Sequence, residues 1–126
     1  KYNLKDYTKK NNKIILSKNF KNFLDNQNRL ILYGAGTISE IILSYKSKNI
    51  ILSSGLKEEN GKKIFNKKIY SNKKLDMLKI SNVVITAIGY EDEILKNNSF
   101  KNKKIYFLKI NKMQNNLQKI QIKNFS

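Results

Sequence analysis

The residues of this chain that best suit ligand binding, by their type and spacing, are small ones that directly follow an apolar run. Gly34-Ala35-Gly36 comes after Leu30-Ile31-Leu32-Tyr33, and apolar residues at helical spacing begin after Thr37. A strand, a tight glycine turn and a helix start form the setting in which a G-x-G-x-x-G/A pattern binds phosphate. Gly34 would permit the sharp turn, and Gly36 would let the backbone approach a diphosphate. The N–H groups at 36–38 would then point at the anion, assisted by the helix dipole.

The third position of this pattern differs from the usual glycine or alanine, because it is Ser39. Serine is small enough for the close helix–strand packing that this position requires. Two interpretations therefore stay open, a nucleotide-binding turn and a sharp strand–helix turn without a ligand. On the first, the binding residues of the turn are Gly34, Ala35, Gly36, Thr37 and Ile38.

A second group of small residues, Ala87 and Gly89, lies at the end of the apolar run Val83–Ile88. The chain contains five Gly and two Ala, and five of these seven residues fall in the two groups. Ligands of open α/β sheets bind outside the carboxyl ends of the strands. Gly89, Tyr90 and Glu91 are therefore expected to line the same site.

The residues that end the next predicted strand bear on which cofactor is bound. Dinucleotide-binding domains place an acidic residue there, which hydrogen-bonds the ribose 2′-OH. This chain has Ser53 and Ser54 at that place, with Lys57 nearby. The two serines suit a phosphorylated ribose or a sugar diphosphate, or they indicate that no NAD is bound. NAD(P) and a nucleotide sugar both remain candidate ligands.

Composition excludes several classes of function. The chain of 126 residues has no Cys, His, Pro or Trp, which excludes zinc fingers, thiol nucleophiles and Ser-His-Asp triads. No catalytic set and no metal site is expected. No apolar run approaches the ~20 residues of a membrane-spanning helix, and the absence of Cys fits a reducing compartment, so we expect a cytoplasmic protein. The chain begins with Lys1 rather than Met, which is compatible with a piece of a longer protein that carries further domains.

The large positive charge is attributed mainly to composition. There are 26 Lys and Arg against 9 Asp and Glu, a formal net charge of +17, which attracts polyanions. However, Arg29 is the only arginine, and the lysines are scattered without the interleaved aromatics that a stacking platform needs. Lys, Asn and Ile, which AT-only codons can encode, make up 62 residues. A solvated basic surface is thus favoured over a nucleic-acid-binding face, which is kept as an alternative.

The elements that must position these residues can be read from hydrophobic periodicity. Strands are expected at about 30–33, 50–52, 83–88 and 105–108, with amphipathic helices between them. Such an alternation indicates an α/β domain with a mainly parallel sheet of about four to five strands. Residues 1–27 are interpreted as an N-terminal extension with a short helix, and residues 28–126 as the binding domain. Four apolar tail residues at helical spacing predict a C-terminal helix that packs on the core or forms a dimer contact: Ile110, Met113, Leu117 and Ile120.

The segment Leu30–Ile42 resembles the opening of Rossmann-type domains of sugar-nucleotide and polysaccharide-biosynthesis proteins. These include the N-terminal domain of sugar-nucleotide acetyltransferases and the cofactor-binding region of nucleotide-sugar dehydratases and epimerases. The resemblance continues through Gly61–Ile64 and Ile69–Ser71, where the family's proline is missing, and ends at Val84–Glu91. It implies a Rossmann-like three-layer sandwich that binds a nucleotide sugar or dinucleotide.

Three functions are consistent with these residues. The first is a nucleotide-binding module of a surface-polysaccharide or sugar-nucleotide biosynthesis protein. The second is an NAD(P)-dependent nucleotide-sugar epimerase or dehydratase. The third is a basic nucleic-acid-binding protein.

Overall fold

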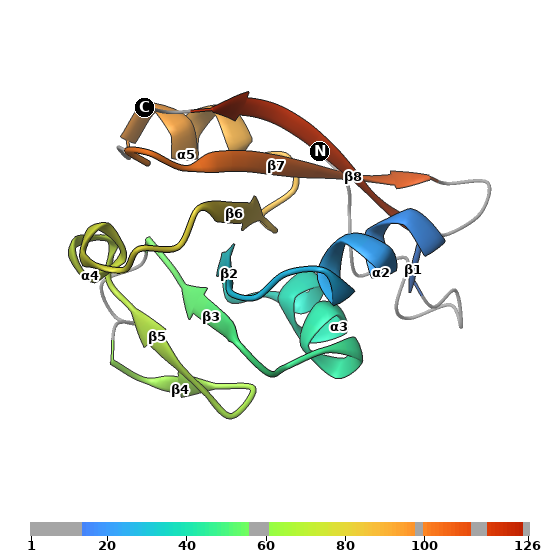
Figure 1. Ribbon diagram of the computed structural model, residues 1–126, viewed down its shortest axis with the longest axis horizontal. Coiled ribbons are helices and arrows are strands. Elements are labelled where there is room, and N and C mark those ends of the chain that lie inside the picture. Colours follow the sequence, from blue (N-terminus) through green and yellow to red (C-terminus); the bar gives the residue numbers. More distant parts are fainter. Residues whose placement is uncertain (1–13, 56–60, 98–99, 112–115, 125–126) are drawn as a thin grey trace.

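The computed structural model describes residues 14–55, 61–97, 100–111 and 116–124. Within these ranges the chain is an α/β structure, in which four helices accompany a mostly parallel sheet (Figure 1). In chain order the elements are β1 (Ile15–Leu16), α2 (Lys18–Asp25), β2 (Leu30–Tyr33), α3 (Thr37–Tyr45), β3 (Ile50–Ser53), β4 (Lys63–Ile64), β5 (Lys67–Tyr70), α4 (Asn72–Met77), β6 (Asn82–Ile85), α5 (Glu91–Asn97), β7 (Lys104–Asn111) and β8 (Asn116–Asn124).

The order of the strands places β2 inside the sheet. Strands are ordered β1-β8-β7-β6-β2-β3-β5-β4, and the run from β7 to β5 is parallel throughout. At the two ends, β8 is antiparallel to β7 and β4 is antiparallel to β5. After β2 the chain passes through α3 to β3 and β5 on one side, and then crosses to β6 and β7 on the other. The strand order therefore reverses between β2 and β6.

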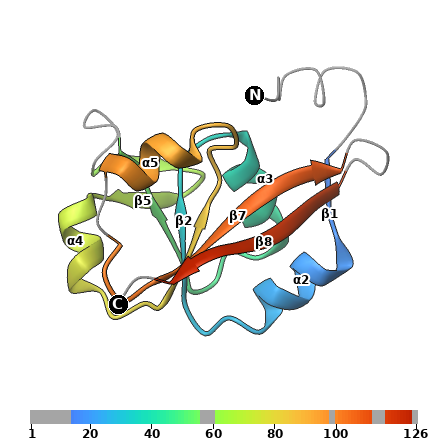
Figure 2. The ribbon, with the colours of Figure 1, turned by 90° about the horizontal axis from the view of Figure 1, so that it is seen from above.

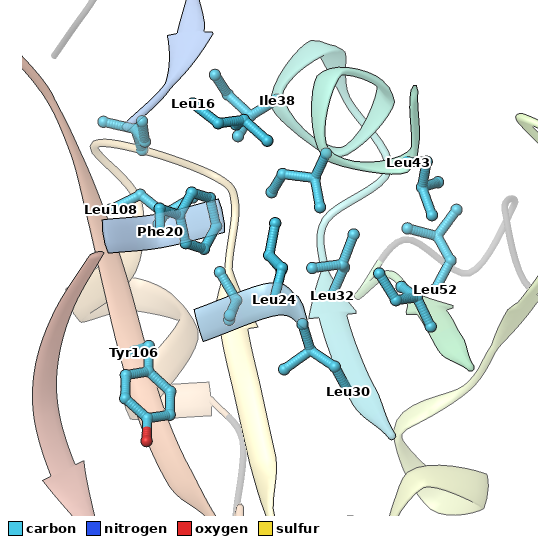
Figure 3. Packing of buried hydrophobic residues seen from close by; sticks show 14 of the residues in the cluster. Leu16, Phe20, Leu24, Leu30, Leu32, Ile38, Leu43, Leu52, Tyr106 and Leu108 are labelled. Carbon is cyan, nitrogen blue, oxygen red and sulfur yellow. The ribbon is translucent and has the colours of Figure 1, made fainter. Parts of the chain in front are cut away.

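Side chains of β2 alternate between two apolar clusters, as the two-residue period of a strand requires. Leu30 and Leu32 belong to a cluster that includes residues of α2 and α3, and Figure 3 shows them beside Leu24. Ile31 and Tyr33 belong to the other cluster, to which α4 and α5 contribute. Figure 2 accordingly shows α2 on the opposite side of β2 from α4 and α5. Both faces of the central strand are thus buried, which explains its unbroken apolar sequence.

Most predicted elements are confirmed. The predicted strands at 30–33, 50–52 and 105–108 correspond to β2, β3 and β7. The predicted strand at 83–88 is too long at its end, because β6 stops at Ile85 and the chain then turns, with Ile88 N–H donating to Thr86 O at 3.0 Å.

The predicted C-terminal helix is wrong. Residues 116–124 form strand β8, which pairs antiparallel with β7 and parallel with β1. Leu117 and Ile120 lie on this strand, Ile110 lies on β7, and Met113 lies outside the described residues. Four apolar residues at helical spacing were a short pattern, whereas the free edge of the eight-residue β7 offers a full row of backbone partners.

The sheet is also larger than the four to five strands expected from the sequence. Eight strands are present in the described ranges, and the additional ones lie at the two ends of the parallel run. The described part of the predicted N-terminal extension contributes β1 and α2. Phe20 and Leu24 of α2 are fully buried in the same cluster as Leu30, so this segment packs directly on the sheet.

Several lysines hydrogen-bond backbone carbonyls at the connections that enter parallel strands. Lys46 Nζ donates to Leu24 O at 2.7 Å before β2, and Lys67 Nζ donates to Ile50 O at 3.0 Å at the start of β3. Lys103 is only 5 % exposed, and its Nζ donates to Leu78 O at 3.3 Å and to Ile80 O at 2.7 Å before β6. These ammonium groups thus add donors to backbone carbonyls at the amino ends of the strands.

Replacing Lys103 by Met is expected to lower the free energy of unfolding by about 1–3 kcal/mol, because Ile80 O would lose a buried donor. Burial lowers the pKa of Lys103 from its usual 10.5, against the opposing effect of the Asp76 carboxylate. The unfolded chain therefore binds more protons between the folded-state pKa and 10.5, and the contribution of Lys103 to stability rises with pH across that window.

Urea denaturation at several pH values measures this effect. The stability difference between the unmodified chain and Lys103→Met should widen as the pH rises toward 10.5. Lys101→Met, at an exposed position of the same turn, is the control and should change stability by less than about 0.5 kcal/mol. A Lys103→Met variant as stable as this control would contradict the structural role of Lys103.

Candidate functional site

The glycine turn lies at the carboxyl end of β2, where the strand order reverses. Gly34 has φ +123°, and its N–H donates to Ser53 O at 2.7 Å, which continues the pairing between β2 and β3. A β-carbon at Gly34 would lie 2.6 Å from Thr86 Oγ1, a distance that real side chains do not adopt. Gly34 is thus required both by its backbone conformation and by the neighbouring strand end.

Gly36 differs from Gly34, because neither conformation nor space requires a glycine there. Its φ is −108°, which any residue can adopt, and a β-carbon would meet no atom of the described residues within 4 Å. Gly36 is the N-cap of α3, and the helix opens with the bond from Glu40 N to Gly36 O at 3.1 Å. The N–H groups at 36–39 precede that bond and have no partner within the helix.

The N-cap of α3 also differs from those of two other helices. Ser17 caps α2 by accepting from Phe20 N at 3.1 Å, and Ser71 caps α4 by accepting from Lys74 N at 3.4 Å. Gly36 provides no side-chain cap. A serine would fit there and would be favoured for helix stability. The amides at the start of α3 are therefore left to a partner other than their own N-cap side chain.

Two buried hydroxyl groups lie behind the turn, and we call Ser39 and Thr86 the hydroxyl pair. Ser39 Oγ donates to Gly34 O, and it lies 2.8 Å from Thr86 Oγ1. Thr86 Oγ1 in turn donates toward Tyr33 O at 3.2 Å and Gly34 O at 3.1 Å. The exposed fractions of Ser39 and Thr86 are 0 % and 4 %, so both groups are internal. Thr86 is not among the site residues predicted from the sequence, which places it in a strand. It is the one hydroxyl residue in the apolar run 83–88, and this exception is the signal that could have identified it.

The loop between β6 and α5 is brought beside the turn by Thr86. Gly89 has φ +94°, and its N–H donates to Glu91 Oε1 at 2.7 Å. The Glu91 carboxylate thus ties the first residue of α5 to the backbone of the preceding loop. Tyr90 is 48 % exposed. The structure brings this predicted loop and the turn of residues 34–38 to the same edge of the sheet, since β6 and β2 are parallel neighbours.

The end of β3 is closed. Ser53 is fully buried, and its Oγ donates to Tyr70 O at 2.7 Å, so this hydroxyl connects β3 to β5. Ser54 is also buried, with 5 % exposure. A β-carbon at Gly55 would lie 2.6 Å from Tyr33 Oη, which shows how closely that phenol approaches the backbone. Neither serine therefore presents an open surface to a ligand, and Lys57 lies outside the described residues.

The clear pKa shift on α3 lies at the other end of that helix. The pKa of Tyr45 is raised, chiefly because its phenol donates to the Asp25 carboxylate, with smaller contributions from burial and from the Asp25 charge. This contact ties α3 to α2. It is separated from the glycine turn by the length of α3.

In the described ranges, no three Asp, Glu, His or Cys residues gather in a way that could hold a metal ion. The helices of those ranges are too short or too polar to cross a membrane. No protein-family model matches the chain, and no curated protein matches it in sequence. Function has to be inferred from the geometry of the turn.

The two glycines of the turn are expected to respond oppositely to substitution. Gly34→Ala should lower the free energy of unfolding by about 2 kcal/mol or more, because of its positive φ and the contact with Thr86. Gly36→Ser should leave stability unchanged or raise it by a few tenths of a kcal/mol, roughly the difference between Ser and Gly as N-caps. Urea denaturation monitored by circular dichroism measures both. Equal losses for the two variants would contradict the distinct roles assigned to these glycines.

Proposed function

We propose that this chain is a nucleotide-binding domain whose Gly34–Ser39 turn binds the phosphate groups of a nucleotide sugar or dinucleotide. The observation that carries the proposal is the uncapped, open start of α3 at Gly36, in a position where serine would fit and would stabilise the helix. Free amides at a helix N-terminus combine with the helix dipole to favour phosphate oxygens.

The arrangement of the sheet supports a Rossmann-like three-layer sandwich as the finer description of the fold. Numbered along the chain, the five strands of the parallel run have the order 3-2-1-4-5, which is the order of the classic dinucleotide-binding fold. Helices contribute to apolar clusters on both faces of β2. In such sheets ligands bind where the strand order reverses, and the glycine turn follows the strand at that point.

The end of β3 favours a nucleotide sugar over NAD. Ser53 stands where an acidic residue would read the ribose 2′-OH, and its hydroxyl is engaged by Tyr70 O. A ligand held mainly through its diphosphate needs no such carboxylate. With the resemblance of Leu30–Ile42 to sugar-nucleotide enzymes, this supports a module of a cytoplasmic sugar-nucleotide or surface-polysaccharide biosynthesis protein.

The nucleic-acid alternative is weakened by the positions of particular lysines. Lys46, Lys67 and Lys103 donate to backbone carbonyls, so a part of the net charge of +17 stabilises the fold. The enzyme alternative requires a redox cofactor and a catalytic set. The nucleic-acid alternative gives no reason for the open space at Gly36.

Thermal-shift screening with UDP-sugars, NAD(P) and CoA tests the proposal. At about ten times its Kd, a true ligand should raise Tm by about 4 °C or more. Gly36→Val should abolish the shift, because its side chain occupies the open space in front of the amides. Ser44→Val adds similar bulk at an exposed position near the end of α3 and should keep the shift.

The proposal fails if no nucleotide raises Tm, or if Gly36→Val retains the full shift. Titration with NAD(P)H, followed by its fluorescence, separates the enzyme alternative. A fluorescence change that Gly36→Val removes would favour the epimerase or dehydratase over the binding module.

DNA titration at several salt concentrations tests the nucleic-acid alternative. If the chain is a nucleic-acid-binding protein, its affinity for a short DNA duplex should fall steeply between about 0.05 and 0.2 M salt and should be the same for Gly36→Val. Fluorescence anisotropy of labelled DNA measures this. Such binding, together with no nucleotide binding, would favour a nucleic-acid-binding protein instead.

A further inference from the structure

The carbonyl group of Gly34 is held toward the interior by the hydroxyl pair. Ser39 Oγ donates to this oxygen, and Thr86 Oγ1 lies 3.1 Å from it. Both hydroxyls are buried, whereas Gly34 and Ala35 are half-buried. The oxygen of the peptide between Gly34 and Ala35 thus faces the core, and its orientation is fixed by two separate side chains.

The planarity of the peptide bond carries this orientation over to the amide of Ala35. There are no cis peptides in the described ranges, so the C=O of Gly34 and the N–H of Ala35 point in opposite directions. With the oxygen directed at the buried hydroxyls, the N–H is directed away from them, on the outer side of the turn. The opposite orientation of the same peptide would present a carbonyl oxygen there, which repels an anion.

We propose that Ser39 and Thr86 are positioning residues that hold the Gly34–Ala35 peptide with its N–H outward, so that Ala35 adds a donor to the amides of residues 36–38. This inference rests on the proposed function and deepens it, since it assigns the phosphate-binding donors to both sides of Gly36. It also gives the departure from the glycine pattern a role. Ala at position 39 would fit the packing but would lack the hydroxyl that bonds the first glycine of the turn.

The pair acts as one unit because its protons are shared. Two hydroxyl protons serve contacts among Ser39, Thr86 and the carbonyls of Tyr33 and Gly34, and the 2.8 Å contact between the hydroxyls lets one donate to the other. With the Ser39 proton donated to Gly34 O, Thr86 is the donor between the two hydroxyls, so removing Thr86 weakens the Ser39 bond to this carbonyl and removing Ser39 eliminates it. The double variant should exceed either single one in its effect on the peptide.

The test uses the full chain, inorganic pyrophosphate as the probe and constant ionic strength, with backbone amide signals followed by NMR. In the unmodified chain the Ala35 amide signal should shift on titration. Ser39→Ala combined with Thr86→Val should weaken pyrophosphate binding at this signal by about tenfold or more, as expected for losing a hydrogen bond to a charged group. Thr86→Ser keeps the hydroxyl and should keep the affinity.

Two controls separate positioning from general stability. Ser44→Ala removes an exposed hydroxyl that donates to Glu40 O on the same helix, and it should leave the Ala35 signal and the affinity unchanged. If the double variant does not fold, Ser39→Ala alone is measured. If the double variant, or Ser39→Ala where the double variant does not fold, binds pyrophosphate as tightly as the unmodified chain, the proposal is overturned.

The orientation of the peptide is measured separately, without any ligand. Removing the hydroxyls should change the carbonyl carbon shift of Gly34 and the hydrogen-exchange rate of the Ala35 amide. If neither changes, the assignment of positioning residues is wrong, whatever the chain binds. If both change but no pyrophosphate or nucleotide binds the unmodified chain, the hydroxyls orient the peptide but the proposed function fails, and with it their role in binding.

Discussion

The arrangement of this protein depends on how the backbone groups are paired where β2 leaves the sheet. Buried carbonyl groups need hydrogen-bond donors. A strand that turns sharply out of a sheet moves away from the N–H groups of the neighbouring strands. Here Tyr33 O accepts from Thr86 N at 3.0 Å, and Gly34 N donates to Ser53 O at 2.7 Å. Sheet-like bonding from both sides therefore extends to the first residue of the turn. The close approach of Thr86 that results leaves room at Gly34 for glycine alone.

At the opposite edge of the sheet, lysine side chains supply hydrogen-bond donors to backbone carbonyls. At the amino ends of β2, β3 and β6, backbone carbonyls accept hydrogen bonds from Lys46, Lys67 and Lys103. A long side chain with three donors at its end can reach carbonyls in turns of irregular shape. Lysine is abundant throughout this chain, so these contacts use a common residue type. The rare small residues are concentrated at the carboxyl edge, where Gly34 has a positive φ and Gly36 is exposed.

The sequence was sufficient to predict secondary structure where a local apolar pattern coincides with burial of the same residues. The run Leu30–Tyr33 is apolar throughout because both of its faces are covered, and its end at Gly34 follows from a positive φ. It was insufficient where pairing over long distances decides. Residues 116–124 form a strand because they pair with the edge of β7. The spacing of apolar residues within this segment does not reveal that partner.

The same limit applies to the candidate site. The positions of the glycine turn and of the loop at Gly89 followed from the small residues themselves, and parallel pairing of β2 with β6 places both at one edge. The role of Ser53 could not be foreseen, because its bond to Tyr70 O depends on β5 lying next to β3. The contact between Ser39 and Thr86 joins residues far apart in the chain, and only the strand order brings them together.

The two glycines of the turn differ in how their surroundings stabilise the backbone. Ser39 and Thr86 place hydroxyl groups on the inner side of Gly34, where they pair with carbonyl oxygens and fix the backbone. At Gly36, on the outer side, a serine would add a cap and a little stability, yet the residue there provides none. A turn that served only to connect a strand with a helix would gain from hydroxyls on both sides. Stabilisation restricted to the inner side agrees with the proposed binding of an anion at the outer backbone surface.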